Sequence, residues 1–343
     1  AACAAFRNQF LLLVRARAGD EAAFEALVAP FRGELAAHGY RMLGSPQDAE
    51  DALQEALLGA WRGLGGFAGR SSLRTWLYRI LTHACLRLAQ RRPTRLLSPA
   101  YGPPRHDVHD LGTPVPGPVW IEPLPAEPAS PDPGPDARYL RREGVELAFV
   151  AALQHLPGIQ RAALILREVL EFPAAEVATI LDTTPAAVNS ALQRARKAVD
   201  ARVTGDPQRA ELAALGDEGQ RKLVAAFVEA WERADVPALV ELLAEDVRFT
   251  MPPLPAWFDG RADVARFVAE RAFETPWRLR PIGANGQLAF ACYQRDPVDH
   301  RFRLGAVNLL ALRAGRIVEI SGFVDPAARH WFDLPAEFSA AAR

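Results

Sequence analysis

Apolar residues recur at helical spacing in two stretches of the chain, residues 1–97 and 138–203. In residues 46–62 they return every three or four positions, as on the buried face of an amphipathic helix. Ser45 and Pro46 are typical of the start of such a helix, since serine caps the first turn and proline suits the first helical position. Both stretches are therefore predicted to be all-α.

A glycine-rich stretch at residues 63–69 follows this helix. Ser71 or Ser72 is then expected to cap a second helix that runs to about Arg92. Two helices joined by a glycine-rich loop are therefore predicted for this part of the chain.

Residues 98–137 contain 12 prolines in 40 positions. Proline has no backbone N–H and a fixed φ, so we expect neither a helix nor a central strand here. The composition predicts an extended, semi-rigid tether between two helical domains. Trp120 and Ile121 are apolar exceptions, and we expect them to dock onto a neighbouring part of the protein.

The pattern changes after a polar stretch at residues 204–217, which is predicted to be a second linker. Runs of β-branched and aromatic residues follow, with turn signals at Asn285-Gly286 and Ala314-Gly315. Strands are predicted at residues 246–251, 277–284, 288–294, 300–313 and 316–324, and helices at about 218–234, 236–244 and 261–273. The C-terminal part is therefore predicted to be an α+β domain.

Composition and charge narrow the class of protein. Half of the residues are hydrophobic, but no run of about 18 apolar residues predicts a membrane span, and we expect a cytoplasmic protein. The three cysteines are scattered and fit neither a disulfide framework nor a zinc site. No other metal site and no cofactor is expected. The net charge is only −1, yet residues 1–97 carry +5 and residues 138–203 carry +2. Basic helical segments of this kind favour binding to nucleic acid.

A helix-turn-helix is predicted at residues 172–199, from the sequence FPAAEVATILDTTPAAVNSALQRAR and the residues that follow it. Apolar residues of the second helix recur at helical spacing, at Val188, Ala191, Leu192, Ala195 and Val199. The residues expected to contact DNA are Thr184, Asn189, Ser190, Gln193, Arg194 and Lys197. Amide side chains can pair with adenine, whereas cations hold phosphates. The alternative is an ordinary helical hairpin with a solvated face.

The segments SPQDAEDALQEALLGAWR at 45–62 and LRTWLYRILTHACL at 73–86 resemble region two of extracytoplasmic-function (ECF) sigma factors. Residues 172–199 resemble region four of the same family. The resemblance implies a transcription initiation factor that binds core RNA polymerase and promoter DNA. It covers roughly residues 8–92 and 138–203.

The resemblance also implies roles for individual residues. The helix at 46–62 would bind the coiled coil of the polymerase's largest subunit through Asp48, Asp51, Gln54 and Glu55. The minus-ten promoter element would be contacted by Arg70, Ser71, Ser72, Arg74, Arg79 and Arg87. Four positions depart from the family's usual residues: His83 replaces an asparagine, Asp182 a glycine, and Asn189 and Ala191 residues that are frequently basic. At Asn189 and Ala191 the departures imply weaker phosphate anchoring or a different upstream sequence preference.

Residues 218–335 resemble the SnoaL-like, ketosteroid-isomerase-like cone, through ADVPALVELLAEDV at 234–247, MPPLPAWFDGR at 251–261 and GRIVEI at 315–320. Some ECF sigma factors carry this domain, together with a linker segment like VWIEPLP at 119–125. The resemblance implies a pocket, whose candidate lining residues are Phe249, Trp257, Asp259, Tyr293, His300 and Asn308. Proton abstraction beside a carbonyl would need a carboxylate or imidazole there, and the candidates are few. We therefore expect no enzyme.

These observations predict two all-α domains and an α+β SnoaL-like cone. The boundaries are 1–97 for region two, 98–137 for the proline-rich linker, 138–203 for region four, 204–217 for a second linker, and 218–343 for a regulatory domain. The expected partners are core RNA polymerase, promoter DNA and, as a candidate, a small-molecule ligand of the C-terminal domain. Two alternatives stay open: an isomerase- or cyclase-type enzyme with a DNA-binding front half, and a one-component regulator that works without polymerase.

Overall fold

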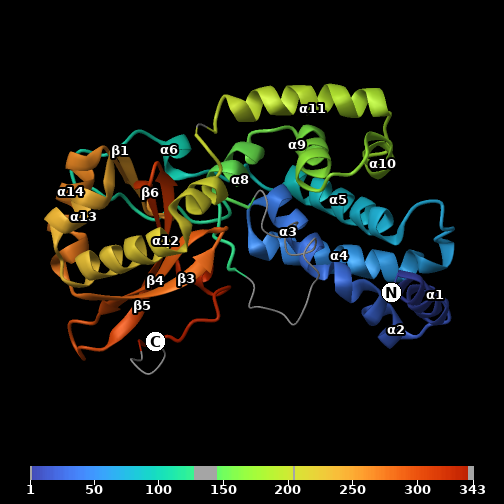
Figure 1. Ribbon diagram of the computed structural model, residues 1–343, viewed down its shortest axis with the longest axis horizontal. Coiled ribbons are helices and arrows are strands. Elements are labelled where there is room, and N and C mark those ends of the chain that lie inside the picture. The colour runs from blue at the N-terminus through green and yellow to red at the C-terminus, as the bar shows by residue number, and fades with distance from the viewer. Residues whose placement is uncertain (1, 127–144, 204, 339–343) are drawn as a thin grey trace. The chain divides into compact units, whose positions relative to one another are not determined.

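The computed structural model describes residues 2–126, 145–203 and 205–338, which form two compact units (Figure 1). Unit 1 comprises the described residues of Ala1–Thr94, Ala129–Val145 and Ala152–Val203. Unit 2 comprises the described residues of Arg95–Pro128, Glu146–Ala151 and Thr204–Arg343. No helix in these described ranges is long and apolar enough to cross a membrane.

The first part of unit 1 is a helical bundle, as predicted. Its helices are α1 (Ala2–Arg17), α2 (Glu21–Val28), α3 (Arg32–Leu43), α4 (Pro46–Gly63) and α5 (Leu73–Arg91). The side chains of Ser45 and Ser72 accept hydrogen bonds from the amides of Asp48 and Thr75, so both predicted caps are confirmed. Helices α3, α4 and α5 pack on one another and bury the apolar stripe that the periodicity predicted.

The second part of unit 1 contains the predicted helix-turn-helix. Its elements are α8 (Leu147–Gln154), α9 (Gly158–Leu164), a π-helical turn (Ile165–Val169), α10 (Ala174–Ile180) and α11 (Pro185–Asp200). The first residues of α8 belong to unit 2, and its last three to unit 1. The helix predicted to resume at about Arg138 lies outside the described residues up to position 144.

Buried polar groups tie the two parts of unit 1 together. The guanidinium of Arg161 on α9 donates to the carbonyl oxygen of Met42 on α3 and to the side chain of Gln154. The amide of Gln154 donates in turn to the carbonyl oxygen of Arg41, 3.3 Å away. Because Arg161 is only 7% exposed, its charge depends on these oxygens for solvation. Burial also lowers the pKa of Arg161 to about 10.

Unit 2 is built on a six-stranded sheet in the order β2-β1-β6-β5-β4-β3. The strands are β1 (Leu243–Thr250), β2 (Trp257–Asp259), β3 (Trp277–Ala284), β4 (Gln287–Arg295), β5 (Phe302–Arg313) and β6 (Arg316–Phe323). Only the β1–β6 pair is parallel. Asn285-Gly286 and Ala314-Gly315 have positive φ at both positions, as tight hairpins require. The five predicted strands are confirmed, and the short β2 was not predicted.

Helices cover one face of this sheet and bury its core. They are α12 (Gln208–Glu232), α13 (Val236–Leu242) and α14 (Arg261–Glu270), with a short α15 (Pro326–Arg329) after the last strand. Helix α12 begins ten residues earlier than predicted, within the supposed linker at 204–217. The first part of this helix is anchored to β5, because Gln208 exchanges two hydrogen bonds with the backbone of Leu312. A break at Gly216, where φ is 64°, separates the two parts of this helix.

The proline-rich linker is not a free tether where the structure describes it. Residues 95–126 belong to unit 2, and Val108 is part of its hydrophobic core. A four-residue helix, α6 (Ser98–Tyr101), also forms where we expected none, because Pro99 occupies its first turn and needs no N–H partner there. Trp120 and Ile121 are buried as expected. Prolines exclude long helices, but they do not prevent apolar side chains from docking.

Candidate nucleic-acid interface

Two helices and a tight turn form the helix-turn-helix. The hydroxyl of Thr184 caps α11 by accepting a hydrogen bond from the amide of Ala187, and Pro185 occupies the first helical position. Asp182, in the turn, has a φ of 51°, a left-handed conformation that usually favours glycine. Aspartate tolerates this conformation better than most residues, which explains how the turn forms without glycine.

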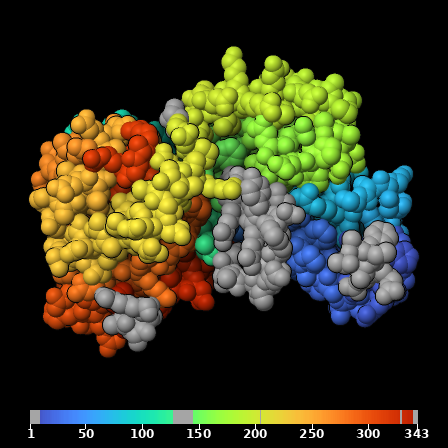
Figure 2. Space-filling model, in the orientation of Figure 1, coloured from blue at the N-terminus to red at the C-terminus, as the bar shows by residue number. Residues whose placement is uncertain are grey.

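Helix α11 has one buried side and one exposed side. The predicted stripe is buried, at Val188, Ala191, Leu192, Ala195 and Val199. The predicted DNA-contacting residues are all exposed, at Thr184, Asn189, Ser190, Gln193, Arg194 and Lys197. Figure 2 shows this helix at the surface of unit 1. Two amide groups and two cations are therefore presented together on a rigid helix.

The polymerase-binding residues predicted on α4 fall into two groups. Asp51, Gln54 and Glu55 are exposed, whereas the side chain of Asp48 is 4% exposed and lies 3.3 Å from Arg92. Asp48 also occupies the first turn of α4, where the helix dipole stabilises a carboxylate. The structure therefore places Asp48 in the framework of the helix and the other three on its surface.

The DNA-contacting residues predicted around α5 differ in their exposure and in their side-chain partners. Arg70 is exposed in the loop, and Ser71 lies partly exposed beside the capping residue Ser72. The guanidinium of Arg74 instead binds both carboxylate oxygens of Glu34 and lies 4.3 Å from the ring centroid of Phe172. Arg74 is thus held inside unit 1.

The other two predicted DNA-contacting arginines of α5 are paired with carboxylates near the surface. Arg79 lies 2.7 Å from Asp182, and Arg87 lies 2.7 Å from Glu55. Both pairs are about half exposed, and exposed ion pairs of this kind are individually weak. The two arginines can therefore exchange their partners for another anion.

Buried polar groups stiffen the framework behind α5. The Nε2 atom of His38 lies 2.9 Å from the hydroxyl of Thr82, and both side chains are fully buried. Burial, reinforced by the positive charges of Arg41 and Arg74, lowers the pKa of His38 to about 3. His38 is therefore neutral at ordinary pH. Burial likewise raises the pKa of the Tyr78 hydroxyl well above its usual value.

Thr75, His83 and Glu176 also meet at this interface, and none of the three was predicted to contact DNA or polymerase. The hydroxyl of Thr75 donates to Glu176 at 2.5 Å. Nε2 of His83 lies 3.0 Å from the carbonyl oxygen of Ile180 and 3.2 Å from a carboxylate oxygen of Asp182. The spacing of Thr75, Arg79 and His83 at four-residue intervals was the one available sequence signal, because it places all three on one side of α5.

The six candidate pocket residues of the C-terminal domain do not gather at one site, although Phe249 and Asn308 both lie beside Gly322. Asp259 is exposed on β2 and His300 is exposed in the β4–β5 turn. Trp257 donates through Nε1 to the carbonyl oxygen of Gly102. Phe249 on β1 and Asn308 on β5 are both buried, on strands that β6 separates, and the ring of Tyr293 contacts Phe338. Among the described residues, no group of His, Cys, Asp or Glu side chains could hold a metal ion.

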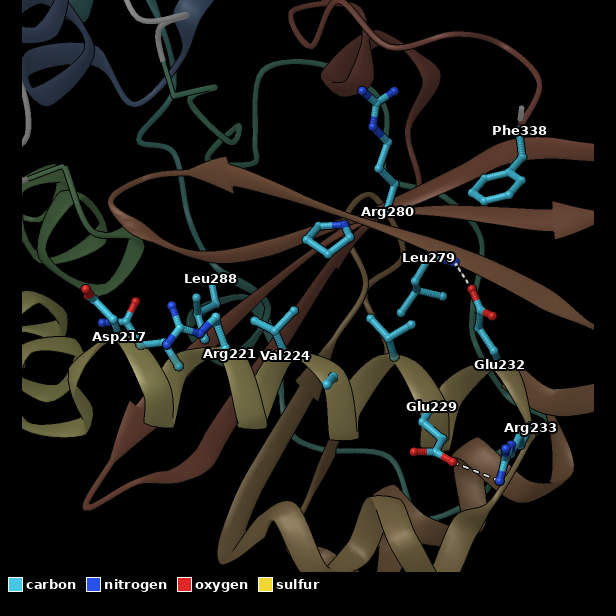
Figure 3. A pocket seen from close by; sticks show the side chains of 14 residues that line it. Asp217, Arg221, Val224, Glu229, Glu232, Arg233, Leu279, Arg280, Leu288 and Phe338 are labelled. Atoms are coloured by element: carbon cyan, nitrogen blue, oxygen red, sulfur yellow. Dashed lines mark hydrogen bonds and ion pairs between the residues drawn. The ribbon is translucent and has the colours of Figure 1, made fainter. Parts of the chain in front are cut away.

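A cavity of about 960 Å³ lies elsewhere in unit 2, between α12 and strands β3 and β4 (Figure 3). Its apolar lining includes Val224, Leu279 and Leu288. Among the charged groups at its rim, Glu229 pairs with Arg233, and Glu232 accepts a hydrogen bond from the amide of Leu279. None of the six predicted pocket residues lines this cavity.

Comparison with protein families matches three models to this chain. Residues 27–94 match Sigma-70 region 2, and residues 146–199 match Sigma-70, region 4. Residues 224–320 match the SnoaL-like domain. The first two models cover α3–α5 and the helix-turn-helix, and the third covers most of the sheet domain.

Individual proteins are similar over longer stretches. The ECF RNA polymerase sigma factor SigG of Mycobacterium tuberculosis is 40% identical over 325 residues, which cover 93% of this chain and 85% of that protein. The ECF RNA polymerase sigma-E factor of Escherichia coli is 30% identical over 194 residues, 56% of this chain and 93% of that protein. The crystal structure of M. tuberculosis SigJ, an extracytoplasmic function sigma factor, covers 89% of this chain and 97% of its own with a TM-score of 0.58. At 23% identity, the SigJ likeness concerns the fold.

Proposed function

This chain belongs to the ECF RNA polymerase sigma factors, and from that premise we propose which of its residues contact polymerase and which contact promoter DNA. As a sigma factor it binds core RNA polymerase and directs it to promoter DNA. In our proposal, Asp51, Gln54 and Glu55 of α4 face the polymerase. The exposed side of α11 reads the upstream promoter element, and the loop and helix from Arg70 onward bind the minus-ten element.

The observation that carries this proposal is the two-sided character of α11. A helix that enters the major groove needs a buried stripe to fix it and an exposed row of amides and cations to contact DNA. Asn189 and Gln193 supply the amides, while Arg194 and Lys197 supply the cations. A solvated hairpin would also expose polar side chains, so the proposal depends on the chemistry of these four residues and on their place in the second helix of the motif.

In vitro transcription with core polymerase, followed by mapping of the start sites, tests the proposal. We expect the full chain to start transcription at defined sites, and Gln193→Ala and Arg194→Ala to reduce it. Lys222→Ala is the control, because it removes an exposed cation from α12 instead. A chain that binds DNA but leaves core polymerase inactive would favour a one-component regulator.

We further propose that the C-terminal domain modulates transcription through the linker. The linker joins the two sigma regions in sequence, and its described part packs on the C-terminal sheet. Arg105 donates from its backbone to the carbonyl oxygen of Trp257 at 2.8 Å, and Val115 donates to that of Pro253 at 2.9 Å. A change that loosens these contacts would alter the length of chain that is free between regions two and four.

Two tryptophan variants separate this role from general stability. Trp257→Phe removes the hydrogen bond to Gly102 of the linker, and Trp277→Phe removes an equivalent bond to Ala272 inside the domain. We expect only Trp257→Phe to change promoter-directed transcription. Equal effects of the two variants, or none from either, would contradict a role of the linker contact.

The C-terminal domain is proposed to act without catalysis. The scattered positions of Asp259, His300 and Asn308 support this view, since general acid–base catalysis needs such groups around one substrate. The cavity beside α12 offers space for a small-molecule effector, because its volume lies within the range of ligand pockets. Turnover of a ketone or polyketide by the chain without polymerase would instead favour the isomerase- or cyclase-type enzyme.

A further inference from the structure

Helix α5 carries a row of polar and basic side chains along one side. Thr75, Arg79, His83 and Arg87 follow one another at four-residue intervals, so they lie about 6 Å apart along the helix axis. A hydroxyl, two guanidinium groups and an imidazole are all donors to an anion when their hydrogens point outward. The row therefore has the chemistry of a site for successive anionic groups.

Carboxylates fill this row within unit 1. Glu176 accepts a hydrogen bond from Thr75, and Asp182 lies within ion-pair distance of both Arg79 and His83. His83 directs Nε2 at two oxygens, the carboxylate of Asp182 and the carbonyl of Ile180, so this nitrogen carries the hydrogen. These two acidic groups come from α10 and from the turn of the helix-turn-helix, whereas Arg87 at the end of the row is paired with Glu55 of α4.

His83 and Asp182 connect the two parts of unit 1. Nε2 of His83 lies 3.2 Å from a carboxylate oxygen of Asp182. The contact joins the helix that is proposed to bind the minus-ten element to the turn that positions α11.

We infer that Thr75, Arg79, His83 and Arg87 form a binding site for the phosphates of a single DNA strand, which Glu176 and Asp182 occupy until DNA displaces them. This inference rests on the proposed function of α5. A carboxylate and a phosphate compete for the same donors, so docking of α10 on α5 and binding of the strand exclude each other. The ion pair of Arg79 with Asp182 is about half exposed, which leaves it weak enough for such an exchange, whereas the hydroxyl of Thr75 is buried until Glu176 is displaced.

The test compares the affinity of full-length variants for labelled oligothymidylate, a single strand without promoter sequence. Asp182→Asn removes the competing charge and keeps a residue that tolerates left-handed backbone. We expect it to bind oligothymidylate about three- to tenfold more tightly at low salt, with a logarithmic salt slope steeper by about 0.7 for each additional phosphate that it binds. Arg79→Gln in the Asp182→Asn background should abolish this increase in affinity.

Matched controls isolate the effect of position. Glu21→Gln removes the same charge from α2, a helix that packs on α1 and the following short turn, and should leave the affinity almost unchanged. Asp182→Gly serves as a second variant, since glycine is favoured at this φ, and it should behave like Asp182→Asn. Thermal melting of each variant verifies that the fold is retained.

Transcription with core polymerase, measured in parallel, separates this inference from the proposed function. One outcome is that the wild-type chain directs transcription, but Asp182→Asn and Asp182→Gly bind the oligonucleotide no better than Glu21→Gln does. This outcome would overturn the competing site and leave the proposed function intact. Tighter binding that persists in the Arg79→Gln background would also overturn it. If Asp182→Asn binds more tightly but the chain never activates polymerase, the result supports the anion site and contradicts the promoter role.

Discussion

The indole Nε1 of Trp257 donates a hydrogen bond to the carbonyl oxygen of Gly102, 2.8 Å away and 155 residues earlier in the chain. This bond joins the second strand of the C-terminal sheet to the proline-rich linker. Nearby, Val108 of the same linker is 2% exposed and belongs to the core of the sheet domain. The linker is therefore a structural part of the C-terminal unit.

Shortening Val108 to alanine should destabilise this unit. The change removes two methyl groups from a closed site and leaves a cavity, which together cost about 1.5–3 kcal/mol of unfolding free energy. Thermal unfolding followed by tryptophan fluorescence measures it, because most of the chain's seven tryptophans lie in unit 2. Val298→Ala is the matched control, since Val298 is 87% exposed. Equal melting temperatures for the two variants would show that the linker does not support the core.

Local patterns predicted most of the elements correctly. Helix caps such as Ser45 and Thr184 act on amides three residues away, and hairpin turns such as Asn285-Gly286 depend on two residues. Such features are encoded within a short window of sequence. Helical periodicity likewise placed the buried side of α11, because burial repeats every turn.

Contacts between distant segments could not be predicted in the same way. Nothing near Arg74 in the sequence indicates that Glu34, 40 residues earlier, binds its guanidinium. Asp48 shares a helix with Asp51 and looks equally acidic, but only packing against the region around Arg92 decides that it is buried. The docking of the linker could not be predicted for the same reason. Its proline content constrains its backbone conformation but does not indicate what its apolar side chains pack against.

The two kinds of acidic residue on α4 should respond differently to mutation. Asp48→Ala removes a buried carboxylate that lies near Arg92 and at the positive end of the helix dipole, so it should cost about 1–3 kcal/mol of stability. Asp51→Ala should change stability by less than about 0.5 kcal/mol, because Asp51 is exposed, and should weaken binding to core polymerase. Urea unfolding and titration with core polymerase check both expectations. A stable Asp48→Ala protein that has lost polymerase binding would reverse the assignment.

Variants on the exposed side of α11 should distinguish base contacts from phosphate contacts. Asn189→Ala should reduce the preference for the mapped promoter over random DNA by about 1–3 kcal/mol, since amides pair with base edges. Lys197→Ala should weaken binding to both DNAs alike and lower the salt slope by about 1, since cations hold phosphates. Affinities for both DNAs at several salt concentrations distinguish the two. If Lys197→Ala changed the sequence preference and Asn189→Ala did not, the assigned roles would be exchanged.

His38 should make the stability of unit 1 depend on pH. Its pKa is about 3 in the folded chain and near 6.5 when unfolded, so the unfolded state binds more protons between these values. The stability is therefore fully present above about pH 6.5 and is lost as the pH falls toward 3. Between pH 7 and 5 this loss should amount to about 2 kcal/mol, at about 1.4 kcal/mol per pH unit well below 6.5.

His38→Gln removes the titrating group and keeps a side chain that can bond to Thr82. Hydrogen exchange of α5 amides reports the stability of this unit separately from unit 2. We expect protection in the wild-type chain to fall more steeply with decreasing pH than in His38→Gln, while carboxylates contribute equally to both. Parallel pH profiles for the two proteins would mean that His38 has the same pKa in the folded and the unfolded chain, because only a group with different pKa values in the two states changes stability with pH.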